Sequence, residues 1–282
     1  MGGLFDKILD FFTGFGDFFQ GIFDFFANPY PVLNGWFTGF ENQLIESAEI
    51  INNGGANNAV LTSTASLVTD AVKPTAWTLL SIFFLIELYD QWQRKQDNFD
   101  FIDLLKGLIK LLVVKNLITI MPFLMQCIRG TVTPIYANLV NANGGALAFD
   151  NISETLATNC SNLSVFSYIS GGAIAFILWI LGMYIHVIAY VRDFELAILE
   201  SLACLPVIFY VYQDTKDIPK RFIFSYASVV MQGLVIMVVF ILYQAMLQDA
   251  LNVGTSSVIF ASAVAFMGIK KSADWAGKAL GQ

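Results

Sequence analysis

The chain has 282 residues, of which 56% are hydrophobic and 13% are charged, and its mean hydropathy is +0.65. A soluble globular domain would carry more charge on its surface, so the composition predicts an all-α, polytopic integral membrane protein. The net charge of −7 and the lack of a basic tract argue against a nucleic-acid-binding surface.

The N-terminal segment repeats the triplet Asp-Phe-Phe every seven residues, at Asp10, Asp17 and Asp24. This spacing places phenylalanines on one face of a helix and acids on the other, which predicts an amphipathic helix in the membrane interface. Its acidic polar face favours the outer surface. A helix packed on a partner subunit is the alternative. The candidate membrane-surface residues are Phe11, Phe12, Phe18, Phe19, Phe25 and Phe26.

Further along, a second amphipathic helix is expected at residues 36–51, and a loop rich in Asn, Gly and Thr at 129–163. Pro74 suits the first turn of a helix. We therefore expect extracytoplasmic amphipathic helices and a linker over 1–73, and a transmembrane helical domain over 74–282. About five spans are expected in that domain, at residues 74–92, 102–128, 165–191, 222–247 and, in a shorter segment, 256–269.

Basic residues predict the orientation, because they gather on the cytoplasmic side of membrane proteins. One set of bases falls on a single side of the predicted spans: Arg94, Lys95, Lys106, Lys110, Arg192, Lys216, Lys220, Arg221, Lys270, Lys271 and Lys278. This places the N-terminus outside and the C-terminus in the cytoplasm. Lys7, Lys73 and Arg129 remain on the outer side.

The basic residues also predict the path of residues 194–212. Arg192 and the bases at 216–221 flank this segment, and both fall on the cytoplasmic side. We therefore expect 194–212 to be a broken, re-entrant helix that bends near Pro206 and is shielded by protein. The acids Glu195 and Glu200 have two interpretations. They form a buried network with Arg192, or Arg192 anchors at the interface while the acids cap the next helix.

No catalytic constellation is found, and a single histidine, His186, excludes a histidine-containing metal cluster. His186 is interpreted as a hydrogen-bonded packing residue, with a proton carrier as the alternative. Glu87 is expected to pair with a base such as Lys115. The sequence predicts no enzymatic activity, no metal and no cofactor, although a bound phospholipid would fit.

Four short motifs carry a resemblance to a known family. They are Arg-x-x-Glu-Leu at Arg192–Leu196, Leu-Pro-Val at Leu205–Val207, Phe-Ser-Tyr from Phe224, and Gln-Gly-x-x-Ile at Gln232–Ile236. Together they resemble TrbL-type subunits, the polytopic inner-membrane channel components of conjugative type IV secretion systems (the VirB-type apparatus). The family commonly has alanine before the proline, where this chain has Leu205.

The resemblance implies a non-enzymatic channel or scaffold subunit in the bacterial cytoplasmic (inner) membrane. It implies a homo-oligomeric ring, five-fold in the family's pattern, that helps carry single-stranded DNA with its relaxase, or protein. Partners would be other copies, further secretion subunits including the ATPases, membrane lipid and, transiently, the DNA. Residues 192–248, with Arg192, Glu195, Glu200 and Pro206, would lie at subunit contacts or along the conduit.

Two other functions stay open. A phage- or toxin-related pore former is supported by the phenylalanine-rich N-terminus. A small-solute transporter is disfavoured because the chain lacks paired repeats with matching broken helices.

Overall fold

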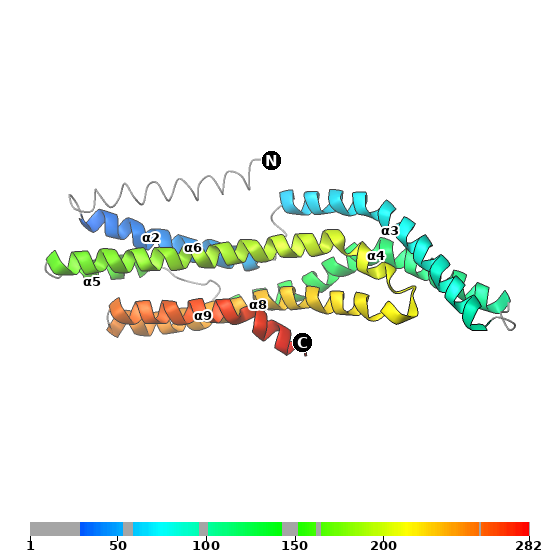
Figure 1. The fold of residues 1–282 in the computed structure, drawn as a ribbon. Helices are drawn as coiled ribbons and strands as arrows, with labels where there is room; N and C mark the ends of the chain where they lie inside the picture. The colour runs from blue at the N-terminus through cyan, green and yellow to red at the C-terminus, as the bar shows by residue number, and fades with distance from the viewer. Residues whose placement is uncertain are drawn as a thin grey trace. The chain divides into compact units, whose positions relative to one another are not determined.

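The computed structural model describes residues 29–52, 59–95, 101–142, 152–161, 165–253 and 255–281. All regular structure in these ranges is helical, which confirms the all-α class (Figure 1). The elements are α2 (Pro29–Asn52), α3 (Ala59–Lys95), α4 (Phe101–Ala142), α5 (Ile152–Ser161), α6 (Val165–Leu202), α7 (Cys204–Ile208), the 3-10 turn η2 (Gln213–Thr215), α8 (Asp217–Val253) and α9 (Thr255–Ala279).

Four helical segments are long and apolar enough to cross a bilayer, namely Leu61–Lys95, Phe101–Asn141, Gly171–Ile208 and Asp217–Val253. The chain is therefore a multi-pass membrane protein. These segments account for four of the five predicted spans. The fifth, 256–269, lies in α9, which is not among them, so a count of five is not confirmed. The predicted interfacial helix, with Phe11, Phe12, Phe18, Phe19, Phe25 and Phe26, lies outside the described residues.

The helix that contains Pro74 begins earlier than expected, at Ala59. Pro74 thus lies inside α3 and not in its first turn. α3 changes direction partway along its length, as expected of a helix with an internal proline (Figure 1). The hydroxyl of Thr69 donates to the carbonyl oxygen of Ala65, which shows how a hydroxyl-rich stretch is accommodated within the helix.

The loop expected at 129–163 is largely helical, because α4 continues to Ala142 and α5 follows. Val132 and Tyr136, four residues apart, are both buried. This continues the helical period beyond the predicted end of the span. Burial of an apolar stripe therefore outweighs the loop preference of the surrounding Asn, Gly and Thr.

The third span also runs further than predicted, because α6 continues through residues 194–202 and ends at Leu202. Ala203 interrupts the helix, and the short α7 contains Pro206. Proline has no N–H to donate to the carbonyl four residues earlier, which explains a break at this point. The expected re-entry is not confirmed. That expectation placed Arg192 on the cytoplasmic side after the end of the third span, whereas Arg192 lies inside α6 and is 2% exposed.

The chain divides into two compact units, each built from three segments. Unit 1 comprises Met1–Val60, Thr133–Asp193 and Gln232–Trp275, and unit 2 comprises Leu61–Val132, Phe194–Met231 and Ala276–Gln282. The division predicted at residue 73 stays a prediction.

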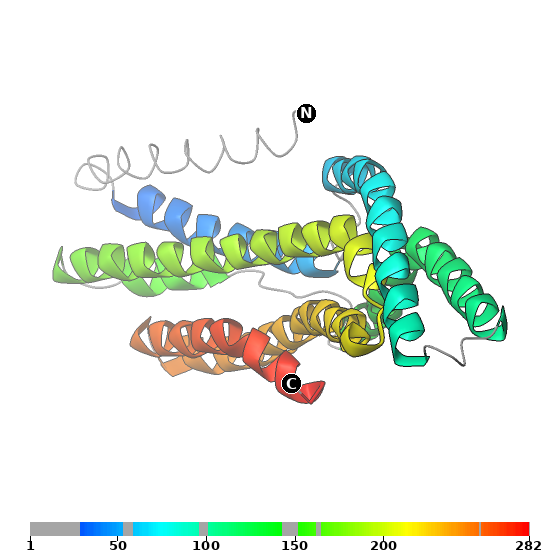
Figure 2. The same cartoon turned by 45° about the vertical axis from the view of Figure 1, so that its right-hand side comes forward.

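In unit 1, α2 presents one buried apolar stripe, at Leu33, Phe37, Phe40, Leu44 and Ile51. The spacing is that of one helix face, which confirms the amphipathic helix predicted at 36–51. α2 lies beside α6 (Figure 2). It also packs on α5, whose first-turn N–H at Ser153 donates to Glu41 Oε2 over 3.2 Å.

The contacts between α2 and α6 advance along both helices together, so the two helices run parallel. A Cβ built on Gly182 of α6 would lie 2.9 Å from Phe40 Cδ2 and would overlap Gln43 Oε1. One turn further along, Ser47 Oγ lies 3.2 Å from His186 Nδ1. Gly182 therefore lets the two helices approach closely.

The parts of α8 and α9 in unit 1 form an antiparallel pair (Figure 1). Tyr243 and Ser262 hydroxyls lie 2.7 Å apart, and Gln232 Nε2 donates to Ser272 Oγ over 3.2 Å. Residue numbers rise along α8 as they fall along α9, which defines the antiparallel direction.

In unit 2, α3 and the first half of α4 also run antiparallel. Lys95 Nζ lies 2.8 Å from Asp103 Oδ2, and Lys110 Nζ lies 3.6 Å from Glu87 Oε1. Near α7, the rings of Phe83 and Phe209 meet edge to face at 5.1 Å. Glu87 thus pairs with a base, as the sequence suggested, and that base is Lys110, where Lys115 was named as the example.

Replacing Gly182 by alanine should destabilise the packing of α2 on α6, because the new methyl group meets Phe40 and Gln43. The expected loss is about 1–3 kcal/mol, typical of overpacking. Thermal unfolding in detergent measures it. Gly35→Ala on α2 is the matched control, because nothing lies within 4 Å of its added Cβ. Equal unfolding temperatures for the two variants would contradict the close approach.

Candidate functional site

Arg192 of α6 is the charged centre of unit 1. Its Nη2 donates to the Tyr136 hydroxyl over 3.2 Å, and its Nη1 lies 3.7 Å from Asp193 Oδ1. The Arg192 and Asp193 side chains are 2% and 4% exposed. A buried guanidinium requires such compensation, because desolvating an unpaired charge is very unfavourable.

Gly233 of α8 provides the space for this guanidinium. A Cβ at this position would overlap the Arg192 guanidinium and the Tyr136 hydroxyl. Arg192 and Gly233 belong to two of the four resemblance motifs, so these motifs meet in space within unit 1.

Glu200 is the charged centre of unit 2. Arg129 Nη1 donates to Glu200 Oε1 over 2.9 Å, and the two side chains are 16% and 10% exposed. The Tyr226 hydroxyl lies 2.7 Å from the same Oε1 and 3.1 Å from the Met125 carbonyl oxygen. A hydroxyl has one proton, and the shorter contact to an ionised acceptor is the stronger one, so Tyr226 is assigned as a donor to Glu200.

A polar pocket of about 130 Å³ lies beside Glu200 within unit 2. Its lining combines hydroxyl, amide and charged side chains with Pro122 and Ala65. Its polar members are Thr62, Ser66, Thr69, Asp70, Lys73, Gln126 and Glu200.

Two bases that fell on the outer side in the sequence count are both paired. Lys73 Nζ lies 2.8 Å from Asp70 Oδ1, and Arg129 is held by Glu200. A base that is neutralised in an ion pair is less strongly restricted to the cytoplasmic side of a membrane. Lys73 and Arg129 on the outer side are therefore compatible with the orientation predicted from the basic residues.

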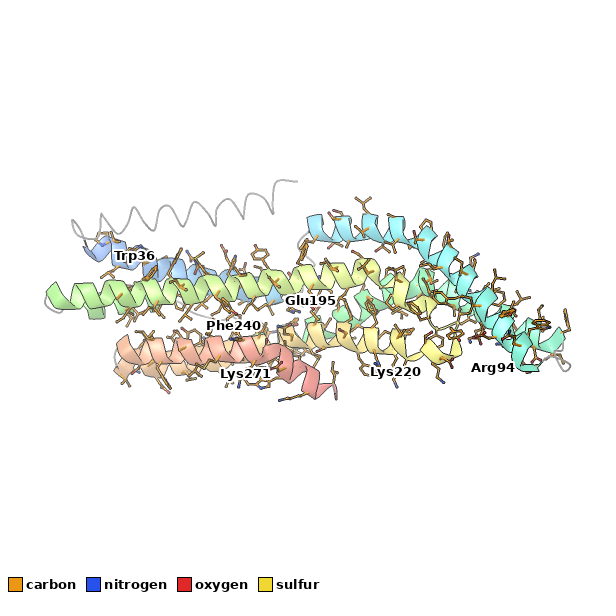
Figure 3. All side chains as sticks on the ribbon, in the orientation of Figure 1. Trp36, Arg94, Glu195, Lys220, Phe240 and Lys271 are labelled. Carbon is orange, nitrogen blue, oxygen red and sulfur yellow. The ribbon has the colours of Figure 1, made fainter. Side chains whose placement is uncertain are left out.

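The predicted network of Arg192, Glu195 and Glu200 is replaced by two separate clusters with other partners. Glu195, labelled on α6 in Figure 3, is exposed. The alternative interpretation, in which Arg192 anchors at the membrane interface, is also wrong, because Arg192 is 2% exposed. Pro206 is half-buried in α7, where its role is to interrupt the helix.

His186 in unit 1 lies between two polar groups of α2. Its Nδ1 contacts Ser47 Oγ, and its Nε2 lies 3.8 Å from Glu46 Oε2. This agrees with a hydrogen-bonded packing residue. Across the described ranges, no group of three or more His, Cys, Asp or Glu side chains could hold a metal ion.

The turn that follows α7 is tied to α3. The Tyr212 hydroxyl donates to Asp90 Oδ2 over 2.9 Å, and this hydrogen bond raises the pKa of the Tyr212 phenol. Arg94 lies 4.0 Å from Asp214. Figure 3 labels Arg94 on α3 and Lys220 near the start of α8.

A second pocket in unit 2 is lined by Lys220, Arg221, Phe224, Leu280 and Gly281. Two bases beside apolar side chains match the chemistry of an anionic lipid headgroup and its first methylenes. This is where the phospholipid considered from the sequence would fit.

Comparison with protein-family models, with curated proteins and with solved structures finds no match for this chain. The resemblance to TrbL-type subunits therefore rests on the four motifs alone.

Sequence reasoning missed the partners of both clusters, which are Tyr136, Asp193, Arg129 and Tyr226. Arg129 carried the clearest signal, because it is an isolated base within an apolar stretch and an exception to the count of bases. An ionisable residue in such a place calls for a partner of opposite charge. Nothing in the sequence identified Glu200 as that partner.

Replacing Glu200 by glutamine should lower the free energy of unfolding by about 3 kcal/mol, because it removes the carboxylate that lies 2.9 Å from the largely buried Arg129 guanidinium. Denaturation in detergent measures the loss. Glu195→Gln is the matched control on the same helix and should change stability by less than about 0.5 kcal/mol.

A double-mutant cycle with Arg129→Gln separates the pair from general damage. The sum of the stability losses in the two single variants should exceed the loss in the double variant, because the effects of substituting two residues in contact are not additive. Additive losses would contradict a direct Glu200–Arg129 interaction.

Proposed function

We propose that this chain is a non-enzymatic channel or scaffold subunit of a conjugative type IV secretion system, similar to TrbL-type subunits. It would act as an oligomeric ring in the bacterial cytoplasmic membrane and help translocate single-stranded DNA with its relaxase, or protein. Energy would come from partner ATPases.

The observation that carries the proposal is where the resemblance motifs lie. Arg192 of the first motif contacts Gly233 of the last. Tyr226, of Phe-Ser-Tyr, bonds Glu200, which lies about two turns beyond Arg192 on α6. Motifs that hold buried charges between helices are suited to a family scaffold, since polar contacts between apolar helices specify how the helices pair.

Large apolar side chains on α3 and α4 support assembly in a membrane. Leu85, Leu112 and Phe123 are each 60% or more exposed. Such surfaces need lipid or another copy of the chain to cover them. A ring places part of this surface between copies and leaves the rest to lipid.

For topology, we propose an outer N-terminus and a cytoplasmic C-terminus. The loop after α7 carries Lys216, and α8 opens with Lys220 and Arg221, which favours the cytoplasmic side. A single long passage of α6 and α7 meets this requirement without re-entry. α9 would then return as a fifth span with Lys270 and Lys271 inside.

Deleting the gene in a donor cell should abolish transfer of the mobile element to recipients and leave donor growth unchanged. Mating assays measure transfer frequency, and the wild-type gene supplied in trans is the control. Normal transfer in the deletion strain would overturn the proposed function. A strictly monomeric protein in lipid would remove the ring.

Single cysteines introduced into a cysteine-free background test the topology. A probe that cannot cross the membrane should label Asn141→Cys in intact cells and should label Lys216→Cys only after lysis. Both native residues are exposed, so access of the probe depends on the side of the membrane. Labelling of Lys216→Cys in intact cells would reverse the orientation.

A small-solute transporter is the second candidate, and the polar pocket beside Glu200 is the observation that favours it. Uptake that fails in the deletion strain while conjugation continues would select this function instead.

A further inference from the structure

At the pocket beside Glu200 in unit 2, the two carboxylate oxygens of Glu200 differ in their hydrogen bonds. Both polar contacts of Glu200 fall on Oε1, from Arg129 and Tyr226. Among the described residues, no donor bonds Oε2. The Glu200 side chain is 10% exposed and lines the pocket, so an almost buried carboxylate has an oxygen left for a ligand.

Two of the three hydroxyls that line the pocket, those of Thr69 and Ser66, are oriented as acceptors. Thr69 Oγ1 donates its proton to the Ala65 carbonyl oxygen over 2.8 Å, and Ser66 Oγ donates to Ser63 over 2.7 Å. Each hydroxyl has one proton, so each oxygen presents lone pairs to whatever lies in the pocket. A ligand that needs oxygen atoms is favoured over one that needs donors.

The bases near the pocket do not make it an anion site. Lys73 Nζ is held by Asp70 at 2.8 Å, and Arg129 is held by Glu200. An anion in the pocket would lie against the carboxylates of Asp70 and Glu200, which repel it. A cation is attracted to Glu200, whose Oε2 accepts no hydrogen bond among the described residues.

Charge and size together favour a monovalent cation. Dedicated divalent sites use several carboxylates, whereas this lining has Asp70, already paired with Lys73, and Glu200. The volume of about 130 Å³ corresponds to roughly four water molecules. A partly hydrated alkali ion fits this space with protein oxygens and waters as ligands.

We propose that this pocket binds a small monovalent cation, Na⁺ or K⁺, through Glu200 Oε2, Thr69 Oγ1 and the neighbouring oxygens of Ser66 and Gln126. The site lies where α3, α4 and α6 meet in unit 2. It is independent of the conjugative function, because it rests on pocket chemistry and not on the resemblance.

The test is the thermal stability of the purified full chain in detergent, in chloride salts of equal ionic strength. Sodium or potassium should raise the unfolding temperature by about 3 °C over N-methylglucamine, at cation concentrations roughly ten times Kd. Lithium and ammonium salts complete the series. Equal temperatures in all salts would overturn the proposal, and a shift with ammonium alone would overturn an alkali ion as the ligand.

Variants locate the site. Thr69→Val removes one ligand and leaves the Glu200–Arg129 pair in place, so it should raise the half-saturating cation concentration at least about tenfold. Thr78→Val is the matched control, because Thr78 makes the same kind of bond, to the Pro74 carbonyl over 3.0 Å, and does not line the pocket. An unchanged half-saturating concentration in Thr69→Val, or an equal rise in Thr78→Val, would overturn the assignment.

Glu200→Gln should abolish the cation-dependent shift in unfolding temperature. The binding of radioactive sodium or rubidium to this variant can be measured even if its stability is low. Undiminished binding by this variant would show that the cation binds elsewhere.

Discussion

The pairing of buried charge is the constraint on which the described structure depends. Glu200 is almost buried among apolar helices, and its carboxylate is stabilised there because Arg129 and Tyr226 contact the same oxygen. These partners come from α4 and α8. The carboxylate therefore specifies where three helices meet within unit 2, which apolar contacts alone define poorly because they have no direction.

In unit 1 the buried charged group is the guanidinium of Arg192. It is larger than the carboxylate of Glu200, so the helix that faces it must leave room for it. Gly233 supplies that room, and Tyr136 and Asp193 supply the polar contacts. Small residues thus allow close helix approach in this unit, at Gly233 around a charge and at Gly182, where α2 packs on α6.

The acidic residues between positions 192 and 200 have different roles. Asp193 and Glu200 stabilise bases, whereas Glu195 is exposed and available for contacts with lipid headgroups, partners or another copy. In the proposed secretion subunit, Arg192 and Glu200 would maintain the scaffold. Glu195 would then be the better candidate for an intersubunit contact. The free oxygen of Glu200 adds a ligand site to a residue whose first role is structural.

The sequence by itself determined the class of protein, four of its spans, the amphipathic face of α2 and the position of the break near Pro206. Hydropathy, helical period and the missing proline N–H are local properties, and they can be read from neighbouring residues. It did not determine that α3 runs through Pro74, that α4 reaches Ala142 or that α6 passes Arg192. In these places burial against distant segments outweighed local loop and proline preferences. Only the tertiary structure decided the partners of Arg192 and Glu200, because an ion pair depends on distance in space, and Arg129 and Glu200 are 71 residues apart in the chain.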